Sequence, residues 1–361
     1  MKIVAITAYN RPTLLYTCLK KLSNICNIKN WQIYISIDPS SLTSEIVSVI
    51  ESFSKSNLKI NFVINDSKMG VRRNPYKLLQ WCFGDEAELV LYLEDDVVVS
   101  SDCLQVAEAI SHTPNFSDYY LCANLLTTTC SSQSILSLPP EVHTAFKAVF
   151  LENKFFSSLG IILNRHQFIK YFEPNWFNYP LKLRSFRGAE TDGWDIAIND
   201  YLLSTNDLFV IQSMIPRISH QGTHGTHADY NFHKSAYSHI RVYEPTPSSF
   251  EENDEKFAIE VIRREDTTTF SEKYNYPYIK SYVNIIHEIT DLQISNINIE
   301  KKLNEKIITM RDSIVESNAT QFALLQKQLI EMELRLNKKS IQIAEKLSFF
   351  INRLIGRNQL S

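Results

Sequence analysis

Short apolar strands alternate with amphipathic helices along the first third of the chain. Apolar or alternating positions predict strands over residues 3–8, 32–37, 58–64 and 88–93. Apolar residues at helical spacing predict helices over 13–23, 43–54 and 74–83, with Thr13 as the candidate cap of the first. Strands that alternate with helices are typical of a mostly parallel sheet with helices on both faces. The pattern therefore predicts an α/β fold.

The periodicity changes in the later parts of the chain. Residues 111–290 mix short apolar runs with loops that contain Tyr and Pro, and we expect them to complete the domain that residues 1–110 begin. From residue 291 onward, apolar residues recur in alternating steps of three and four, which is a heptad signature. The pattern predicts that residues 291–361 form a long helical extension, as in a coiled coil.

Basic residues dominate the end of this extension. Six Lys and Arg residues follow residue 334, against Glu345 as the one acidic residue. A basic amphipathic helix can contact an anionic membrane surface. The alternative is an ordinary coiled coil that joins copies of the chain and carries solvated lysines. Peripheral membrane contact and a homo-oligomer both stay open as predictions.

Composition narrows the class of protein. The chain has 361 residues, 44% of them hydrophobic, and a net charge of -3, so nothing in its charge points to nucleic acid. The six cysteines form no CxxC pair and lie among apolar neighbours, as expected of buried, reduced thiols. The segment 1–9 becomes polar too soon for a signal peptide, and no run of about 18 apolar residues occurs. We therefore expect a cytoplasmic protein. Any contact with a membrane would be peripheral and at the inner face of that membrane.

Polar residues follow three of the predicted strands. They are Asn10-Arg11, Asp38 and the acidic triplet Glu94-Asp95-Asp96. Ligands of open α/β sheets bind at the carboxyl ends of the strands, so we expect these groups to gather at one edge. Buried carboxylates are costly without a compensating cation or donor network. Mg²⁺ and Mn²⁺ bind one or two carboxylates together with substrate phosphates, which makes Asp96 a candidate metal ligand. The alternative is a solvated acidic turn.

Arg11 and Asp38 are candidate binding residues at the same edge. An arginine there can pair with a diphosphate through its fork of N–H donors. An aspartate beyond the second strand can accept a hydrogen bond from a uracil N–H or a ribose hydroxyl. The alternatives are a surface arginine in a turn and a turn-forming aspartate before Pro39.

Two later segments also concentrate reactive side chains. Glu190, Asp192 and Asp195 lie within six positions, and one such carboxylate can take the proton of an attacking hydroxyl. Trp194 beside them either stacks on a sugar or anchors the loop in the core. The stretch 218–227 places two glycines among three histidines, without the spacing of a zinc site. There a histidine either binds a diphosphate or metal, or forms hydrogen bonds within the loop.

In this order, the motifs resemble those of GT-A glycosyltransferases, and more narrowly the N-acetylglucosaminyltransferase I family with its protein O-mannose relative. Six segments carry the resemblance, which covers roughly residues 1–240. They are Ala8-Tyr9-Asn10-Arg11-Pro12, Ile35-Ser36-Ile37-Asp38, Leu93-Glu94-Asp95-Asp96, Phe155-Phe156-Ser157-Ser158-Leu159-Gly160 and Trp194-Asp195, followed by the loop 217–225. The chain departs from the family pattern at Ile161, Ile196 and Gln221.

The resemblance implies a GT-A fold and an inverting transfer from a UDP-sugar, UDP-N-acetylglucosamine, with Mn²⁺ or Mg²⁺ as cofactor. The acceptor is a glycan, a lipid-linked sugar or a protein. Residues 1–110 would then bind the nucleotide-sugar and residues 111–290 the acceptor. The implied site residues are Arg11 at the diphosphate, Asp38 at the base, Glu94 and Asp95 at the sugar and ribose, Asp96 at the metal, Gly160 in the pocket, Asp195 as base with Asp192 in reserve, and His220 and His224 in a closing loop.

Two other functions compete with this prediction. A nucleotidyltransferase also places carboxylates at strand ends, but it usually has an early Gly-rich phosphate loop, and the chain has none. An inactive GT-A scaffold that only binds carbohydrate is the second. The presence of both Asp96 and Asp195 argues against it.

Overall fold

The structure, a computed structural model, describes residues 1–54, 58–126, 146–178, 183–184, 190–191, 193–223, 237, 240, 242–245, 258–263, 291, 295, 298–299, 302, 305–306 and 331. The chain divides into two compact units. The first comprises Met1–Pro180 with Asp192–Gln293, and the second comprises Leu181–Thr191 with Ile294–Ser361.

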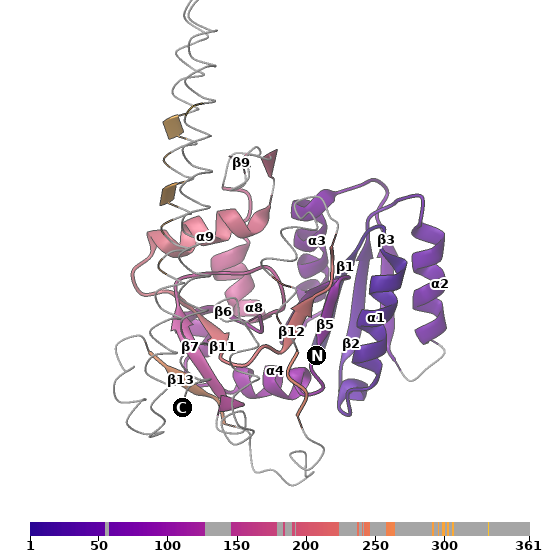
Figure 1. The fold of residues 1–361 in the computed structure, drawn as a ribbon, viewed down its shortest axis with the longest axis horizontal. Coiled ribbons are helices and arrows are strands. Elements are labelled where there is room, and N and C mark those ends of the chain that lie inside the picture. The colour runs from indigo at the N-terminus through magenta and orange to yellow at the C-terminus, as the bar shows by residue number, and fades with distance from the viewer. Residues whose placement is uncertain are drawn as a thin grey trace, which may run out of the picture. The chain divides into compact units, whose positions relative to one another are not determined.

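A mixed β-sheet forms the centre of the first unit (Figure 1). Its described strands are β1 (Lys2–Ala8), β2 (Gln32–Ile37), β3 (Ile60–Ile64), β4 (Leu89–Glu94), β6 (Tyr120–Asn124), β7 (Val149–Asn153), β8 (Ile161–Asn164), β11 (Phe209–Ser213) and β13 (Glu260–Ile262). Among the described residues their order is β13-β7-β11-β6-β8-β4-β1-β2-β3. Strands β4, β1, β2 and β3 are parallel, so their carboxyl ends lie at one edge.

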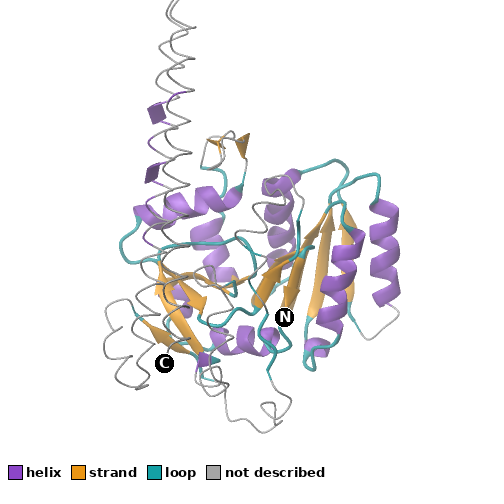
Figure 2. Cartoon of the chain, in the orientation of Figure 1, coloured by secondary structure: helices purple, strands orange, loops and turns teal. Residues whose placement is uncertain are grey.

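Helices cover both faces of this sheet, as Figures 1 and 2 show. They are α1 (Pro12–Ser23), α2 (Thr43–Ser54), α3 (Gly70–Gly84), α4 (Cys103–Ser111), α5 (Phe116–Tyr119), α8 (Arg165–Gln167) and α9 (Trp194–Ser204), with a 3-10 turn η1 (Ile28–Asn30) and a π-helix η2 (Phe168–Phe172). Helices α1, α2 and α4 pack on one face with Val4 and Ile6, whereas α3 and α9 pack on the other with Ile3 and Ala5. Strand β1 is buried on both faces, as is typical of parallel sheets.

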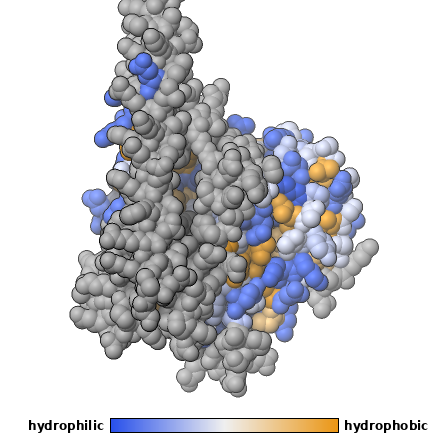
Figure 3. Space-filling model, viewed as in Figure 1, coloured by the Kyte–Doolittle hydropathy of each residue, from blue (hydrophilic) through white to orange (hydrophobic). Residues whose placement is uncertain are grey.

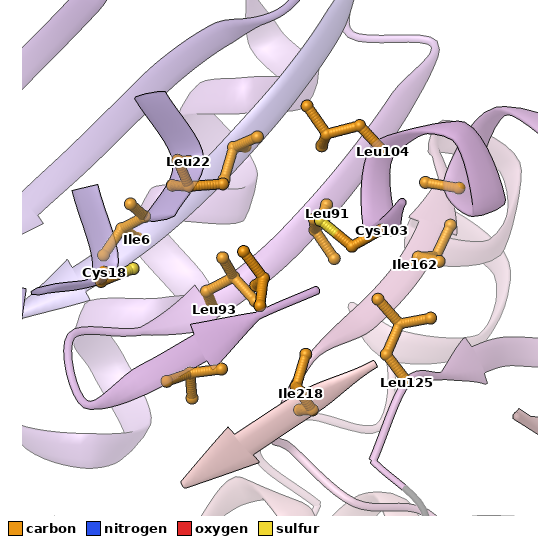
Figure 4. Packing of buried hydrophobic residues seen from close by; sticks show 14 of the residues in the cluster. Ile6, Cys18, Leu22, Leu91, Leu93, Cys103, Leu104, Leu125, Ile162 and Ile218 are labelled. Atoms are coloured by element: carbon orange, nitrogen blue, oxygen red, sulfur yellow. The ribbon is translucent and has the colours of Figure 1, made fainter. Parts of the chain in front are cut away.

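A short two-stranded ladder lies next to the end of β4. β5 (Val97–Val99) pairs antiparallel with β12 (Ile218–His220), and His220 is opposite Val97. Ile218 belongs to the same buried cluster as Leu93 and Leu125, and Figure 4 shows these side chains together. The ladder therefore joins the acidic triplet to a segment more than a hundred residues away in sequence.

The prediction of an α/β sheet with helices on both faces is confirmed. The prediction that Thr13 caps the first helix was wrong. Arg11 is the residue before α1, and Pro12 is its first residue, so Thr13 lies inside the helix. Proline is favourable at this position because its missing N–H would have no partner in the helix.

The predicted start of the third helix was also wrong, since α3 begins at Gly70 and not at residue 74. Pro75 hides this start in the sequence, because proline disfavours a helical residue before it. In the structure the carboxylate of Asp38 accepts hydrogen bonds from the backbone N–H groups of Met69 and Gly70. A distant side chain thus stabilises the first turn of α3.

The second unit contains the described hairpin of β9 (Leu183–Arg184) and β10 (Glu190–Thr191), which pair antiparallel. The predicted coiled coil lies outside the described residues apart from single helical positions, and the boundaries 1–110, 111–290 and 291–361 stay predictions. In the described part of the chain, no helix is long and apolar enough to cross a bilayer.

The described cysteines are all free thiols. Four of them are buried, as predicted, but Cys26 is exposed. Hydrophilic and hydrophobic residues are interspersed on the described surface that faces the viewer in Figure 3.

Candidate active site

The parallel strands bring the predicted polar residues together at one edge of the sheet. The register pairs Thr7 of β1 with Glu94 of β4. The ladder continues one residue further on both sides of β1, because the N–H of Asp38 donates to Ala8 at 2.9 Å and that of Asp95 donates to Thr7 at 3.1 Å. The segments after β1, β2 and β4 therefore meet, as the sequence predicted.

A cluster of opposite charges occupies this edge. The guanidinium of Arg11 bridges both aspartates: its Nη2 lies 2.6 Å from Oδ1 of Asp95, and its Nη1 donates to Oδ2 of Asp96. The same Oδ2 of Asp96 lies 3.0 Å from Nε2 of His220. The backbone N–H of Tyr9 donates to Asp95 at 3.2 Å. Both aspartates are almost fully buried, whereas a quarter of the Arg11 side chain is exposed.

The loop after β12 closes one side of this cluster. The N–H of Gln221 donates to the backbone carbonyl of Asp96 at 2.8 Å. A Cβ atom at Gly222 would lie 2.2 Å from Oδ2 of Asp96 and 3.0 Å from Nη1 of Arg11. The backbone at Gly222 therefore packs directly on the carboxylate, and a side chain there has no room. The sequence indicated a tight glycine loop near a polar group, but not which group.

The donor set around Asp96 fits a hard divalent cation. Its Oδ1 atom is buried and has no hydrogen-bond partner among the described residues. Such an oxygen is costly to bury unless a cation or donor reaches it. Within the same described residues, no group of three or more His, Cys, Asp and Glu side chains is arranged to hold a metal. A cation at Asp96 would therefore need oxygen atoms from a substrate, as Mg²⁺ and Mn²⁺ commonly do.

The pKa values of all three carboxyl groups of the acidic triplet differ from their ordinary values. Burial, together with the charges of Asp96, Asp95 and Asp195, raises the pKa of Glu94 to about 8, although Arg11 opposes the rise. Burial also raises the pKa of Asp95 to about 6, again against the effect of Arg11. Burial opposes the ionisation of Asp96 too, but the hydrogen bond and charge of His220 lower its pKa below the ordinary value. Clustered carboxylates of this kind favour the binding of a cation.

Asp195 lies in the first turn of α9. Its charge is the smallest of the contributions that raise the pKa of Glu94, after burial and the charges of Asp96 and Asp95. Trp194 is 2% exposed and stacks on Trp176 with ring centroids 4.1 Å apart. Of the two roles considered for Trp194, the structure shows the anchor in the core. This anchor fixes the start of α9 and hence the position of Asp195.

Two asparagines hold the segment 155–160 beside α9. Asn199 exchanges two hydrogen bonds with the backbone of Phe156, at 2.9 and 2.8 Å. Asn124 donates to the carbonyl of Ser157 at 2.7 Å. Gly160 has a φ of +63°, and a Cβ there would lie 2.4 Å from Ile218. Gly160 thus allows close packing under β12, while its contact with a ligand stays a prediction.

Asp38 is already engaged within the protein. Its Oδ1 accepts from Asn65 and from the N–H of Met69, both at 3.0 Å, and its Oδ2 accepts from Gly70 at 2.7 Å. The side chain is 2% exposed. These bonds organise the turn before α3, and the contact with a base stays a prediction. Two other candidates, Asp192 and His224, lie outside the described residues.

A buried ion pair that the sequence did not reveal positions β12. Arg217 is fully buried, and its Nη2 lies 3.1 Å from Oδ2 of Asp102. The backbone of Arg217 also bonds Leu125 at 3.0 Å and Ser100 at 2.7 Å. These contacts hold the strand that carries His220 toward Asp96. No local pattern marks them, because the partners are 115 positions apart.

Comparisons with known proteins give one family match. Residues 3–116 match the model of Glycosyl transferase family 2. This segment is less than half of the chain, and it contains β1 to β4 and the acidic triplet. No curated protein matches the chain significantly.

Two of the solved structures with some similarity are complexes with a nucleotide-sugar. One is S. aureus TarS 1–349 in complex with UDP-GlcNAc, with 16% identity, a TM-score of 0.42, and coverage of 63% of this chain and 60% of that chain. The other is the mannosyltransferase PcManGT from Pyrobaculum calidifontis with GDP-Man and Mn²⁺, with 11% identity, a TM-score of 0.41, and coverage of 98% and 86%. The chain thus spans less than two thirds of the TarS chain that it matches.

Proposed function

We propose that the protein is a GT-A glycosyltransferase that moves a sugar from a UDP-sugar, UDP-N-acetylglucosamine, to an acceptor hydroxyl with inversion. The observation that carries this proposal is Asp96, whose buried Oδ1 has no hydrogen-bond partner among the described residues, at the carboxyl edge of a parallel sheet. The Glycosyl transferase family 2 match over residues 3–116 supports the same class of enzyme.

In this proposal, the strand-end residues bind the donor. Asp96 would hold Mn²⁺ or Mg²⁺ together with the phosphates of the donor, and His220 lies adjacent to the same carboxylate. The cation, when bound, supplies Lewis-acid stabilisation of the charge on the departing diphosphate. Arg11 contacts the diphosphate, because its side chain is a quarter exposed and its guanidinium lies beside Asp96. Asp38 contacts the base, and Glu94 and Asp95 face the sugar and ribose.

The proposed base is Asp195 in the first turn of α9. Its carboxylate accepts the proton of the acceptor hydroxyl as that oxygen bonds to the anomeric carbon of the donor. The bond from the anomeric carbon to the diphosphate breaks at the same time, and UDP leaves with that electron pair. An in-line attack of this kind inverts the anomeric centre. Asp192 is the reserve candidate for the same role, and the loop with His220 and His224 closes over the donor.

The acceptor is a glycan, a lipid-linked sugar or a protein. Assembly of copies through the residues from 291 onward, and contact of their basic end with a membrane, belong to the proposal as well. They rest on the heptad pattern and on the basic residues after residue 334.

The direct test is UDP release from a panel of UDP-sugars with Mn²⁺, for the wild type, Asp96→Ala and a matched control. Asp118→Ala is a suitable control, because Asp118 is exposed and lies outside the site. We expect release with one sugar, loss of release with EDTA or in Asp96→Ala, and normal release in Asp118→Ala.

The alternatives give different results when pyrophosphate release and sugar binding are measured beside UDP release. A nucleotidyltransferase would release pyrophosphate from a nucleoside triphosphate, and an inactive scaffold would bind sugar without releasing UDP. Pyrophosphate release would rule out the proposed transfer, and sugar binding without UDP release, with mixed glycan acceptors added, would favour the scaffold.

A further inference from the structure

Three groups surround Oδ2 of Asp96. It accepts from Nη1 of Arg11 and lies 3.0 Å from Nε2 of His220. The backbone of Gly222 closes a third side, since a Cβ there would lie 2.2 Å away. Arg11 also reaches Asp95 with its second Nη atom, at 2.6 Å. One guanidinium therefore pairs with both buried aspartates of the triplet.

This arrangement places a permanent positive charge on Oδ2 of the same carboxylate whose Oδ1, without a hydrogen-bond partner among the described residues, is the candidate cation ligand. A cation on the Asp96 carboxylate and a guanidinium on the same carboxylate repel one another, and burial weakens the screening of that repulsion by water. Arginine stays protonated under all ordinary conditions, so it does not leave by losing its proton. A cation on Oδ1 is therefore bound more tightly when the Arg11 side chain moves away from Oδ2.

The structure allows such a movement of the side chain alone. The backbone of Arg11 is held, because its carbonyl accepts from the N–H of Leu15 at 3.0 Å and Pro12 begins α1 directly after it. The side chain is a quarter exposed, in contrast to the buried aspartates. A diphosphate at this edge offers the guanidinium a bidentate partner that competes with the two carboxylates.

We propose that Arg11 acts as an internal counter-ion which blocks Asp96 until a nucleoside diphosphate draws it away, so that cation and nucleotide bind cooperatively. The inference rests on the proposed function, because it assigns the nucleoside diphosphate and the cation to this edge. Coupling between two ligands is reciprocal, so the nucleotide strengthens cation binding by the same factor as the cation strengthens nucleotide binding. Arg11 is thus a gate for the metal as well as a contact for the donor.

The test measures Mn²⁺ binding to the full chain by calorimetry, with and without UDP, and needs no turnover. For the wild type we expect weak Mn²⁺ binding alone and an affinity at least tenfold higher with saturating UDP. For Arg11→Gln we expect Mn²⁺ alone to bind at least tenfold more tightly than to the wild type, with little further gain from UDP. Arg165→Gln removes an exposed arginine outside the site and should behave as the wild type.

Two further measurements test the role of the Arg11 charge if Arg11→Gln alone gives an ambiguous result. Arg11→Lys keeps one positive charge but cannot bridge two carboxylates, and it should bind Mn²⁺ with an affinity between those of wild type and Arg11→Gln. If Arg11→Gln is only marginally folded, its melting temperature should rise more on addition of Mn²⁺ than that of the wild type.

The results separate this inference from the proposed function. Mn²⁺ binding to Arg11→Gln that is no tighter than to the wild type overturns the role of Arg11 as a gate, whether or not sugar is transferred. Wild-type protein that binds Mn²⁺ but neither binds UDP nor releases it from any UDP-sugar overturns the proposed function. In that case, tighter Mn²⁺ binding by Arg11→Gln would still support the competition at Asp96.

Discussion

The replacement Gly222→Ala tests most directly how the loop after β12 contributes to the site. The added Cβ would lie 2.2 Å from Oδ2 of Asp96, whereas unstrained non-bonded atoms of this kind stay about 3.5 Å apart. The carboxylate or the loop must therefore move by roughly 1 Å. Asp96 cannot move freely, because Arg11 and His220 hold the same oxygen.

A displacement of about 1 Å at a reacting group commonly costs about 100-fold in rate. We therefore expect Gly222→Ala to lower UDP-sugar turnover by about that factor and to weaken Mn²⁺ binding. Overpacking of this kind should also reduce the free energy of unfolding by about 1–3 kcal/mol. The assays are steady-state UDP release with Mn²⁺ and denaturant unfolding monitored by circular dichroism.

The matched control is Gly84→Ala at the end of α3, where a Cβ meets nothing within 4 Å. Alanine is the better helix former, so this variant should keep full activity and gain up to about 1 kcal/mol of stability. Activity of Gly222→Ala within threefold of the wild type would refute the argument that the loop backbone fixes Asp96.

Three more predictions follow from the same geometry. Asp195→Asn should lower transfer by about 10²–10⁴-fold while UDP and Mn²⁺ still bind, as measured by turnover and calorimetry; near-normal turnover would remove Asp195 as the base. Arg217→Met leaves Asp102 buried without its charged partner and should cost about 3–5 kcal/mol of unfolding free energy, whereas a change below about 1 kcal/mol would show that the pair does not hold β12. Trp194→Ala removes a ring stacked on Trp176 and should cost about 3–5 kcal/mol, with turnover reduced because α9 loses its anchor; unchanged thermal stability would contradict that role.

Much of the fold could be predicted because its elements have local causes. The alternation of apolar runs and helical spacing over the first hundred residues is a short-range property, and the strands begin or end within two residues of the predicted ranges. Where the prediction failed, a distant group decided the outcome. The start of α3 depends on the carboxylate of Asp38, which belongs to the turn after β2 and has no sequence signature at residue 70.

The candidate site also has one part that the sequence predicts and another part that depends on distant contacts. Arg11, Asp38 and the triplet 94–96 could be placed together from the sequence, because parallel strands necessarily bring their carboxyl ends to one edge. The sequence also indicated that a glycine- and histidine-containing loop lies near a polar ligand. It could not indicate that His220 and Gly222 contact one oxygen of Asp96.

The sequence by itself determined the α/β class, the parallel direction of the first strands and the row of charged groups at their ends, since these follow from the local alternation of short apolar runs with helical spacing. Only the tertiary structure decided how those groups are paired. The antiparallel ladder of Val97–Val99 with Ile218–His220, and the buried pair of Arg217 with Asp102, join positions more than a hundred residues apart. Such pairings depend on the shape and packing of the whole core, and no local pattern of residues specifies them.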